Sequence, residues 1–284
     1  MFAITGATGQ LGRLVMKTLL DKVPAANIVA AVRDPAKAAD LKVLGVQVRE
    51  ANYDRQETLV TAFEGVDKLL LISSSEVGQR TAQHCAVIAA AKRAGVGLIA
   101  YTSILHADRS PLPLAAEHKE TEAMLRSSGI PHVLLRNGWY TENYLASVPV
   151  ALQHGVVLGS AGNGRIAFAA REDYALAAAT VITKDAQAGR IYELAGDDAY
   201  TLAEFAAEIA RQSGKPVAYN DLPQEDFKTA LLQAGLPEGL ATLLAESDAG
   251  AAEGGLFDGS GQLSQLIGRA TTPLAALVKA ALKQ

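Results

Sequence analysis

Residues 1–15 read MFAITGATGQLGRLV, and the rest of the chain is interpreted outward from this stretch. An apolar run leads into three glycines, Gly6, Gly9 and Gly12, and a helical pattern follows at once. A strand, a glycine turn and a helix together present backbone amides and the positive end of a helix dipole to a pyrophosphate. Gly6 would allow the turn, Gly9 the close approach of a phosphate, and Gly12 the packing of helix on sheet. We therefore predict a dinucleotide-binding motif, with a plain structural turn as the alternative.

The composition narrows the class of protein. The 284 residues are 49% hydrophobic, which is ample for a packed core, and the net charge of -4 argues against non-specific nucleic-acid binding. No apolar run is long enough to span a membrane, and no basic region with an apolar core indicates a signal peptide. The single cysteine, Cys85, excludes an intramolecular disulfide and is interpreted as a buried small hydrophobe. We expect a cytoplasmic protein without a metal, a nucleic-acid partner or a membrane partner.

Six apolar runs alternate with helical patterns in the first half of the chain. These runs lie at about 2–5, 27–33, 46–49, 67–73, 98–103 and 132–137. Such alternation predicts an α/β fold with a doubly wound parallel Rossmann sheet and right-handed crossovers. Ligands of this fold bind outside the carboxyl ends of the strands.

Beyond Asn143 the pattern changes to glycine-rich loops and helices. We predict a Rossmann domain that binds NADP(H) at 1–143. A smaller, mainly helical C-terminal lobe at 144–284 would bind the substrate. Strands at about 155–170 and 190–195 are expected to return to the Rossmann sheet.

Capping residues predict where three helices begin. Asp34, which is followed by proline, would cap a helix over 36–44. Thr201 and Glu204 have the spacing of a capping box. Asp173 is a possible cap of the helix that begins near it.

The residue at the end of the second strand indicates which dinucleotide binds. A preference for NAD would place Asp or Glu here to accept from the ribose 2′-hydroxyl, but the residue is Arg33. A guanidinium cannot accept a hydrogen bond, whereas it can donate two to a 2′-phosphate. The sequence therefore favours NADP(H) over NAD(H), and the alternative is a solvated surface arginine.

The chain lacks the catalytic dyad of ordinary short-chain dehydrogenases, Tyr-x-x-x-Lys. None of its eight tyrosines has a lysine four residues later. The helix where that tyrosine is expected reads AAEHKETE over 115–122, and His118, Thr121 and Glu122 share one of its faces. Reduction of a ketone makes an alkoxide that needs a proton donor, whereas reduction of a quinone makes a phenolate-like anion whose conjugate acid has a pKa of roughly 10. The missing dyad is consistent with an electrophilic acceptor, and equally with no chemistry.

Several segments resemble a known family. GATGQLG at 6–12, LLLISSSEVGQR at 69–80, YTSILHAD at 101–108, EHKETE at 117–122 and LLRNGWYTENYL at 134–145 are similar to NADPH-dependent quinone oxidoreductases of the NmrA-like, atypical branch of the short-chain dehydrogenases. The resemblance covers essentially the whole chain. The triphenylmethane dye reductases are a sister group that is less similar around the serine run and Trp139. A fungal nitrogen-metabolite repressor is another relative, and it works as a regulator.

The resemblance implies a set of cofactor-binding residues. The pyrophosphate would be held by the glycine turn, the 2′-phosphate by Arg33, the nicotinamide ribose by the serine run, and the nicotinamide side by the segment after the sixth strand. These residues are Gly6, Ala7, Thr8, Gly9, Gln10, Leu11, Gly12, Arg33, Ser73, Ser74, Ser75, Asn137, Gly138, Trp139, Tyr140, Thr141 and Glu142. The serine run has an ordinary polar loop as its alternative interpretation, and Trp139 a core role.

Four residues are candidates for roles near the substrate. Asn143 and Tyr140 are the candidates for orienting a quinone carbonyl. His118 is either a proton donor or relay, or a satisfied structural group. Arg171 either reaches the cofactor or ties the two lobes together.

The sequence thus predicts a two-electron reduction of a quinone to a hydroquinone by direct hydride transfer from NADPH. One alternative is reduction of triphenylmethane dyes or other electrophiles, and another is a non-catalytic regulator that senses NADP(H). The helix over 81–94 and the final helix over 273–282 are possible dimer surfaces, although core packing explains them as well.

Overall fold

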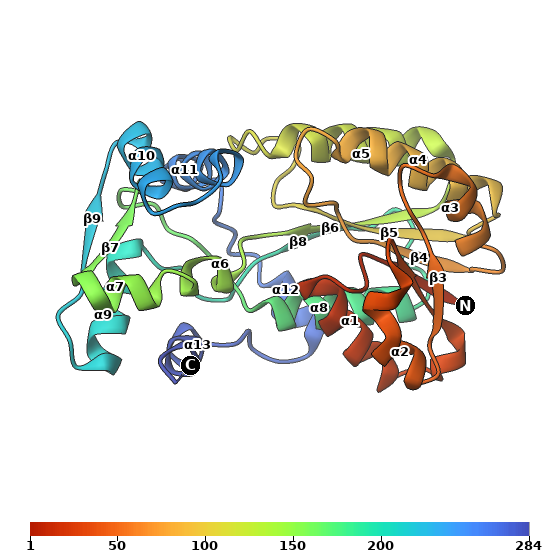
Figure 1. The fold of residues 1–284 in the computed structure, drawn as a ribbon, viewed down its shortest axis with the longest axis horizontal. Helices are drawn as coiled ribbons and strands as arrows, with labels where there is room; N and C mark the ends of the chain where they lie inside the picture. The colour runs from red at the N-terminus through yellow and green to blue at the C-terminus, as the bar shows by residue number, and fades with distance from the viewer. Residues whose placement is uncertain (284) are drawn as a thin grey trace. The chain divides into compact units, whose positions relative to one another are not determined.

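The computed structural model describes residues 1–283, and its helices and strands are drawn in Figure 1. They follow one another as β1 (Phe2–Thr5), α1 (Gln10–Leu20), the 3-10 turn η1 (Ala25–Asn27), β2 (Ile28–Val32), η2 (Pro35–Ala38), α2 (Ala39–Val43), β3 (Gln47–Glu50), α3 (Gln56–Ala62), β4 (Lys68–Leu71), α4 (Arg80–Arg93), β5 (Leu98–Ile104), α5 (Ala115–Ser128), β6 (His132–Asn137), α6 (Thr141–Leu145), α7 (Val148–His154), β7 (Val156–Gly159), α8 (Arg171–Thr183), β8 (Ile191–Leu194), α9 (Leu202–Ser213), β9 (Ala218–Asp221), α10 (Gln224–Gln233), α11 (Glu238–Ala252), α12 (Gln262–Ile267) and α13 (Leu274–Ala281).

The large sheet has seven strands in the order β3-β2-β1-β4-β5-β6-β8. The strand pairs from β3 through β6 are all parallel, and the register sets Phe2 of β1 opposite Ile28 of β2 and Lys68 of β4. The order 3-2-1-4-5-6 is that of a doubly wound dinucleotide-binding sheet, whose direction of winding reverses beside β1. The predicted α/β Rossmann sheet is confirmed.

Helices cover both faces of this sheet. Figure 1 shows α3, α4 and α5 on one face and α1, α2 and α8 on the other. On the first face Ala3, Val29 and Leu69 belong to one buried cluster with Leu59 and Phe63 of the α3 region. Because side chains alternate along a strand, the neighbouring residues point to the opposite face, and they are buried as well. Burial on both faces explains why the strands read as continuous apolar runs.

The chain forms two compact units that interleave along the sequence. Unit 1 comprises Met1–Ile104, Glu117–Asn137 and Glu172–Tyr192, and unit 2 comprises Leu105–Ala116, Gly138–Arg171 and Glu193–Gln284. The sequence-based division placed one boundary after residue 143, whereas the units exchange chain segments several times. The assignment of one part to the cofactor and the other to the substrate stays a prediction.

A second, two-stranded sheet lies in unit 2. β7 pairs with β9 in parallel, with Val156 opposite Ala218 and Gly159 opposite Asp221. The expectation that a strand within 155–170 returns to the Rossmann sheet is therefore wrong, because its partner is a strand some sixty residues later that periodicity alone did not reveal. β8, at the other expected position, does lie in the large sheet beside β6.

The capping predictions had mixed outcomes. The Asp34 side chain accepts a hydrogen bond from the Ala36 amide at 3.0 Å, although the segment after it is a 3-10 turn followed by the short α2. The capping box of Thr201 and Glu204 is confirmed at the start of α9. Asp173 is not a cap, because α8 already begins two residues before it.

The surface differs from the sequence-based expectation at one position. Cys85 is exposed, so its interpretation as a buried hydrophobe is wrong. It lies on the outward side of α4, whose inward side is occupied by Val87, Ala90 and Ala91.

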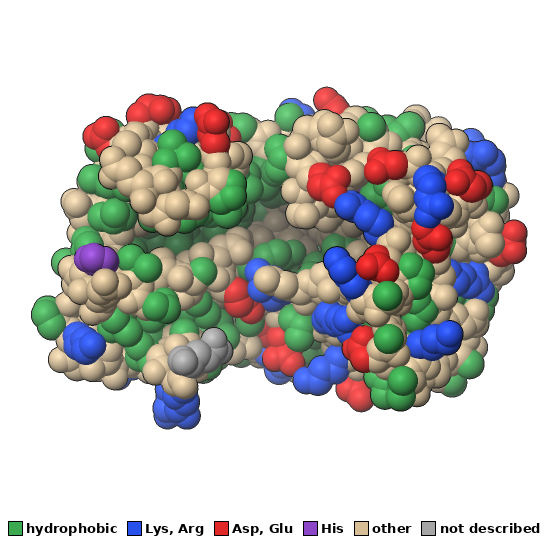
Figure 2. Space-filling model, in the orientation of Figure 1, with side chains coloured by type: hydrophobic (Ala, Val, Ile, Leu, Met, Phe, Trp, Pro, Cys, Tyr) green, Lys and Arg blue, Asp and Glu red, His purple; other side chains and the backbone are tan. Residues whose placement is uncertain are grey.

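On the face of unit 1 seen in Figure 2, acidic and basic side chains are interspersed. Within residues 1–283, no helix has both the length and the hydrophobicity needed to cross a lipid bilayer.

The glycine turn generates a stability prediction. A Cβ at Gly12 would lie 2.1 Å from the Gly6 carbonyl oxygen, so we expect Gly12→Ala to destabilise the fold by about 1–3 kcal/mol. A Cβ at Gly239 in α11 would have no atom within 4 Å, and Gly239→Ala is expected to be neutral or slightly stabilising. Urea unfolding of both variants measures the difference, and equal midpoints would contradict the close-approach argument.

Candidate functional site

The glycine turn joins the carboxyl end of β1 to α1. Gly6 has a φ of +60°, a conformation that side chains rarely adopt, and its carbonyl accepts the Gly9 amide at 2.9 Å. Gly9 is the N-cap of α1 and provides no side-chain cap for the first amides of the helix. Those amides and the helix dipole are therefore available to an anion. Of the predicted residues in this turn, Gly6, Thr8, Gly9 and Gln10 reach the surface, whereas Ala7, Leu11 and Gly12 are buried.

Arg33 lies directly after β2 and is exposed. Its guanidinium donates a hydrogen bond to the carboxylate of Glu76, which follows β4. This contact raises the pKa of Arg33 and lowers the pKa of Glu76. The arginine is evident from the sequence, whereas its partner is not, because the two residues are distant in the chain.

The serine run follows β4 and is held mainly through its backbone. The Ser73 amide donates to Thr102 Oγ1 at 2.8 Å, and the Ser74 amide donates to His84 Nε2 at 3.0 Å. The Ser74 carbonyl accepts from Arg80 Nε at 2.7 Å. With both backbone groups of Ser74 paired, the loop is positioned by α4 and β5, and the Ser75 side chain remains exposed.

His84 and Arg80 hold the backbone of Ser74 in place, and the sequence alone did not predict either contact. An amide can only donate, so His84 Nε2 accepts from Ser74 and the ring proton is on Nδ1, which lies 3.0 Å from Thr121 Oγ1. Burial, followed by the charge of Arg80, lowers the pKa of His84 to about 3. The imidazole is therefore neutral at physiological pH, as its acceptor role requires. The one feature of the sequence that could have indicated this contact is a histidine in the second turn of α4, close to the serine run.

One polar face of α5 is buried, and its side chains form hydrogen bonds with neighbouring residues. His118 Nδ1 lies 2.7 Å from the Tyr101 hydroxyl, and Glu122 accepts from Ser103 Oγ at 2.7 Å and from Arg136 Nε at 3.0 Å. The predicted shared face of His118, Thr121 and Glu122 is confirmed, since these side chains are at most 4% exposed. Burial lowers the pKa of His118 well below its ordinary value. A neutral, buried histidine with a partner has the features of a structural group, and its proposed role as a proton donor stays a prediction.

Unit 2 brings four of the predicted residues together. The Arg171 guanidinium lies 4.8 Å from the centroid of the Tyr140 ring and donates to Asn143 Oδ1 at 3.4 Å. Both carboxylate oxygens of Glu142 accept from the Arg171 backbone amide, at 2.9 and 3.0 Å. Glu142 thus caps the start of α8 and holds Arg171 beside Tyr140. This group, Tyr140, Glu142, Asn143 and Arg171, is called the Arg171 cluster.

The remaining predicted residues form the backbone that leads to this cluster. Asn137 ends β6 and is buried in unit 1. In unit 2 the Gly138 amide donates to the Leu194 carbonyl at 2.7 Å, and the Thr141 amide donates to the Ala169 carbonyl at 2.9 Å. Trp139 is only 8% exposed, a burial typical of a core side chain. Contacts of this segment with a nicotinamide stay a prediction.

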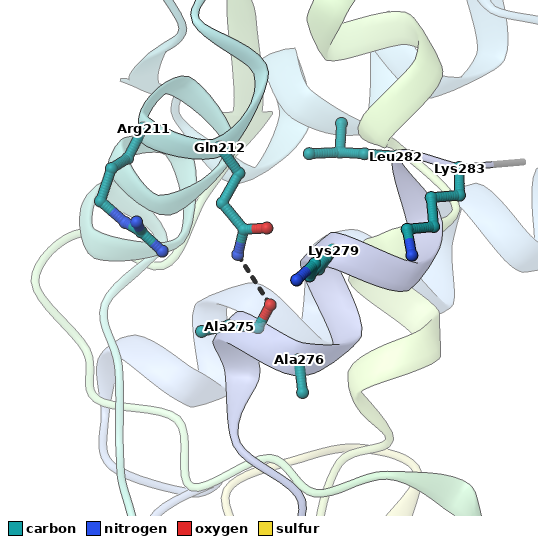
Figure 3. A pocket seen from close by; sticks show the side chains of 7 residues that line it. All are labelled: Arg211, Gln212, Ala275, Ala276, Lys279, Leu282 and Lys283. Carbon is teal, nitrogen blue, oxygen red and sulfur yellow. Dashed lines mark hydrogen bonds between the residues drawn. The ribbon is translucent and has the colours of Figure 1, made fainter.

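An open pocket of about 630 Å³ lies elsewhere in unit 2, between α9 and the segment from α13 to Lys283 (Figure 3). Gln212 closes one side of it by donating to the Ala275 carbonyl at 2.7 Å. The pocket is lined by Arg211, Gln212, Ala275, Ala276, Lys279, Leu282 and Lys283. It shares no residue with the predicted site.

The fold and the glycine turn define a dinucleotide-binding α/β protein. A profile of the NmrA-like family matches residues 1–277, and the chain belongs to that family. Quinone oxidoreductase 2 of Escherichia coli is 61% identical over 275 residues, which are 97% of this chain and 96% of that protein.

Two solved structures are similar over their full lengths. An Escherichia coli NADPH-dependent quinone oxidoreductase complexed with NADPH matches with a TM-score of 0.98 and 60% identity, covering 99% of this chain and 100% of that chain. A Citrobacter sp. triphenylmethane reductase complexed with NADP(H) matches with a TM-score of 0.95 and 39% identity, covering the same shares. The family resemblance inferred from the sequence is thereby confirmed.

The contact between His84 and Ser74 generates a paired prediction. His84→Gln keeps an acceptor for the Ser74 amide, whereas His84→Ala removes it, so we expect only the alanine variant to lose dinucleotide affinity, by about fivefold to tenfold. Calorimetric titration with NADPH measures both. A similar affinity in the two variants would contradict the positioning role.

The glutamine variant also tests the linkage to pH. Because the folded-state pKa of His84 is lowered from 6.5 to about 3, the unfolded chain binds a proton there more readily than the native one. This contribution to stability is present above pH 6.5 and is lost as the pH falls toward 3. We expect the thermal midpoint of the wild type to fall over that range, and that of His84→Gln to fall less steeply.

Proposed function

We propose that this chain catalyses the two-electron reduction of quinones to hydroquinones with NADPH as hydride donor. The observation that carries the proposal is the full-length, 61% identical match to an Escherichia coli quinone oxidoreductase, in a chain with an open glycine turn and Arg33 after β2. The NADPH complex of the similar solved structure supports the choice of cofactor. No flavin is required, because NADPH itself supplies a hydride.

The residues of unit 1 fit a phosphorylated dinucleotide. At Gly12 there is no room for a Cβ beside the Gly6 carbonyl, so the helix start lies as close to the turn as a pyrophosphate site requires. Arg33 would bind the 2′-phosphate through paired N–H donors, and the exposed Ser75 side chain lies in the loop proposed for the nicotinamide ribose. Each of these groups follows a strand at the carboxyl edge of the large sheet.

The proton requirement of the reaction supports a quinone more than a ketone. The side chains of α5 that occupy the place of a catalytic dyad are buried and paired with Tyr101, His84, Ser103 and Arg136. A hydroquinone anion has a conjugate acid with a pKa of roughly 10 and can take its proton from water. Positioning of the reactants is then the main contribution of the protein.

The Arg171 cluster is the proposed source of polar groups for the substrate. The side-chain amide of Asn143 has donors that can meet a carbonyl, and the Arg171 guanidinium adds positive charge beside the Tyr140 ring. A positive charge stabilises the negative charge that develops on a quinone oxygen. A cytoplasmic location and a homodimer formed through α4 or α13 are further parts of the proposal.

Turnover with a quinone panel tests the proposal. Protein, NADPH and each quinone are mixed, and the absorbance of the reduced nicotinamide is followed, with a triphenylmethane dye as a parallel acceptor. We expect oxidation of NADPH with quinones. Faster turnover of the dye would favour the dye-reductase alternative, for which the 39% identical Citrobacter enzyme is the supporting observation. Tight NADPH binding without turnover of any acceptor would favour a sensor.

Arg33→Asp tests the choice of coenzyme. The substitution replaces the phosphate-binding cation with an acceptor for a ribose hydroxyl, so kcat/KM with NADPH should fall at least tenfold while that with NADH is retained or rises. The ratio of the two kcat/KM values is the measurement. An unchanged ratio would remove Arg33 from the site.

Asn143→Ala tests the substrate assignment. Loss of one hydrogen bond to the quinone carbonyl is expected to lower kcat/KM for the quinone by up to about tenfold. The dissociation constant of NADPH should stay unchanged. Asn220→Ala, at an exposed position of β9 in the same unit, is the matched control and should leave both quantities as in the wild type. An equal loss of cofactor affinity would place Asn143 at the cofactor instead.

A further inference from the structure

The ion pair between Arg33 and Glu76 crosses the carboxyl edge of the large sheet. Arg33 follows β2 and Glu76 follows β4, and these strands flank β1 in the sheet. Parallel strands have their carboxyl ends on the same edge, so the pair bridges the end of β1, where the glycine turn begins. The carboxylate thus meets the guanidinium at the place where a dinucleotide is proposed to bind.

Glu76 is held in this position by neutral groups. Its second carboxylate oxygen accepts from Gln83 Nε2 at 2.6 Å, and its backbone amide donates to Ser74 Oγ at 3.2 Å. Gln83 lies on α4 and is only 5% exposed. Neither of these two partners is charged, so Arg33 is the cation that faces the Glu76 carboxylate in this contact.

The pair is partly exposed, which limits its strength. The side chains of Arg33 and Glu76 are 59% and 41% exposed, and ion pairs in such positions change an equilibrium by at most about fivefold. A 2′-phosphate carries more charge than a carboxylate and can take two hydrogen bonds from one guanidinium. It can therefore displace Glu76, at a cost in affinity equal to the strength of the pair.

We propose that Glu76 is a specificity-determining residue that competes with the 2′-phosphate of the cofactor for Arg33. This inference rests on the proposed role of Arg33 in NADPH binding. A ligand with a free 2′-hydroxyl leaves the pair of Arg33 and Glu76 intact, whereas a ligand with a 2′-phosphate must break it. Glu76 therefore weakens the binding of the phosphorylated form selectively, and it reduces the preference that Arg33 creates.

The test is calorimetric titration of the full-length protein with adenosine 2′,5′-bisphosphate and with 5′-AMP. In Glu76→Gln we expect the bisphosphate to bind about twofold to fivefold more tightly, with 5′-AMP unchanged. If Glu76 instead serves to hold Arg33 in its binding orientation, the bisphosphate will bind more weakly. Unchanged or weaker binding of the bisphosphate would overturn the inference.

Three matched variants show whether an effect of Glu76→Gln comes from the lost contact with Arg33, from the change in net charge or from misfolding. Glu64→Gln removes the same charge from an exposed position of unit 1 after α3 and should have no effect. Glu76→Asp keeps the charge but shortens the side chain and so weakens the contact with Arg33. Like Glu76→Gln, it should therefore bind the bisphosphate more tightly than the wild type. In an Arg33→Ala background, Glu76→Gln should change nothing, because the competed group is gone.

The ligands also separate this inference from the proposed function. Neither contains a nicotinamide, so binding is measured without turnover. A wild type that prefers the bisphosphate, with a preference that Glu76→Gln leaves unchanged, overturns only the competition. A wild type without that preference, in which Glu76→Gln creates none either, overturns the competition and the assignment of Arg33 together.

Discussion

The structure of unit 1 depends on one close approach between backbones. The start of α1 lies so near the Gly6 carbonyl that position 12 has no room for a Cβ atom. This contact directs the uncapped end of α1 at the carboxyl edge of the sheet, where the loops after β2 and β4 also lie. The helix dipole and the uncapped amides of α1 thus lie at the same edge as Arg33. The glycines thus create the geometry, and Arg33, after the neighbouring strand β2, is the residue proposed to select the phosphorylated dinucleotide.

Buried polar groups lie behind the serine run, and two of them, His118 and Thr121, are on α5, the helix where a catalytic dyad was expected. His84, Thr121, Tyr101 and His118 satisfy one another, and burial keeps both imidazoles neutral. A network of this kind orders the loop after β4, and the role of His118 as a proton donor stays a prediction. Such an arrangement suits an acceptor whose reduced form is a weak base. The chemistry proposed for this chain therefore depends on the fact that the polar side chains of α5 already have hydrogen-bond partners within the protein.

Unit 2 contributes a different kind of order. Glu142 caps α8 and in doing so holds Arg171 against Tyr140 and Asn143. A carboxylate at a helix start is stabilised by the helix dipole, so this cluster is anchored by secondary structure.

The sequence by itself determined the parallel sheet, the glycine turn and the capping box of α9, because each depends on residues close together in the chain. Only the tertiary structure decided that β7 pairs with β9, that Cys85 faces outward, and that Glu76 meets Arg33. The same holds for the contact of His84 with Ser74 across the start of α4. These features depend on which surfaces meet after the strands align, and hydrophobic periodicity carries no information about the partner of a polar side chain.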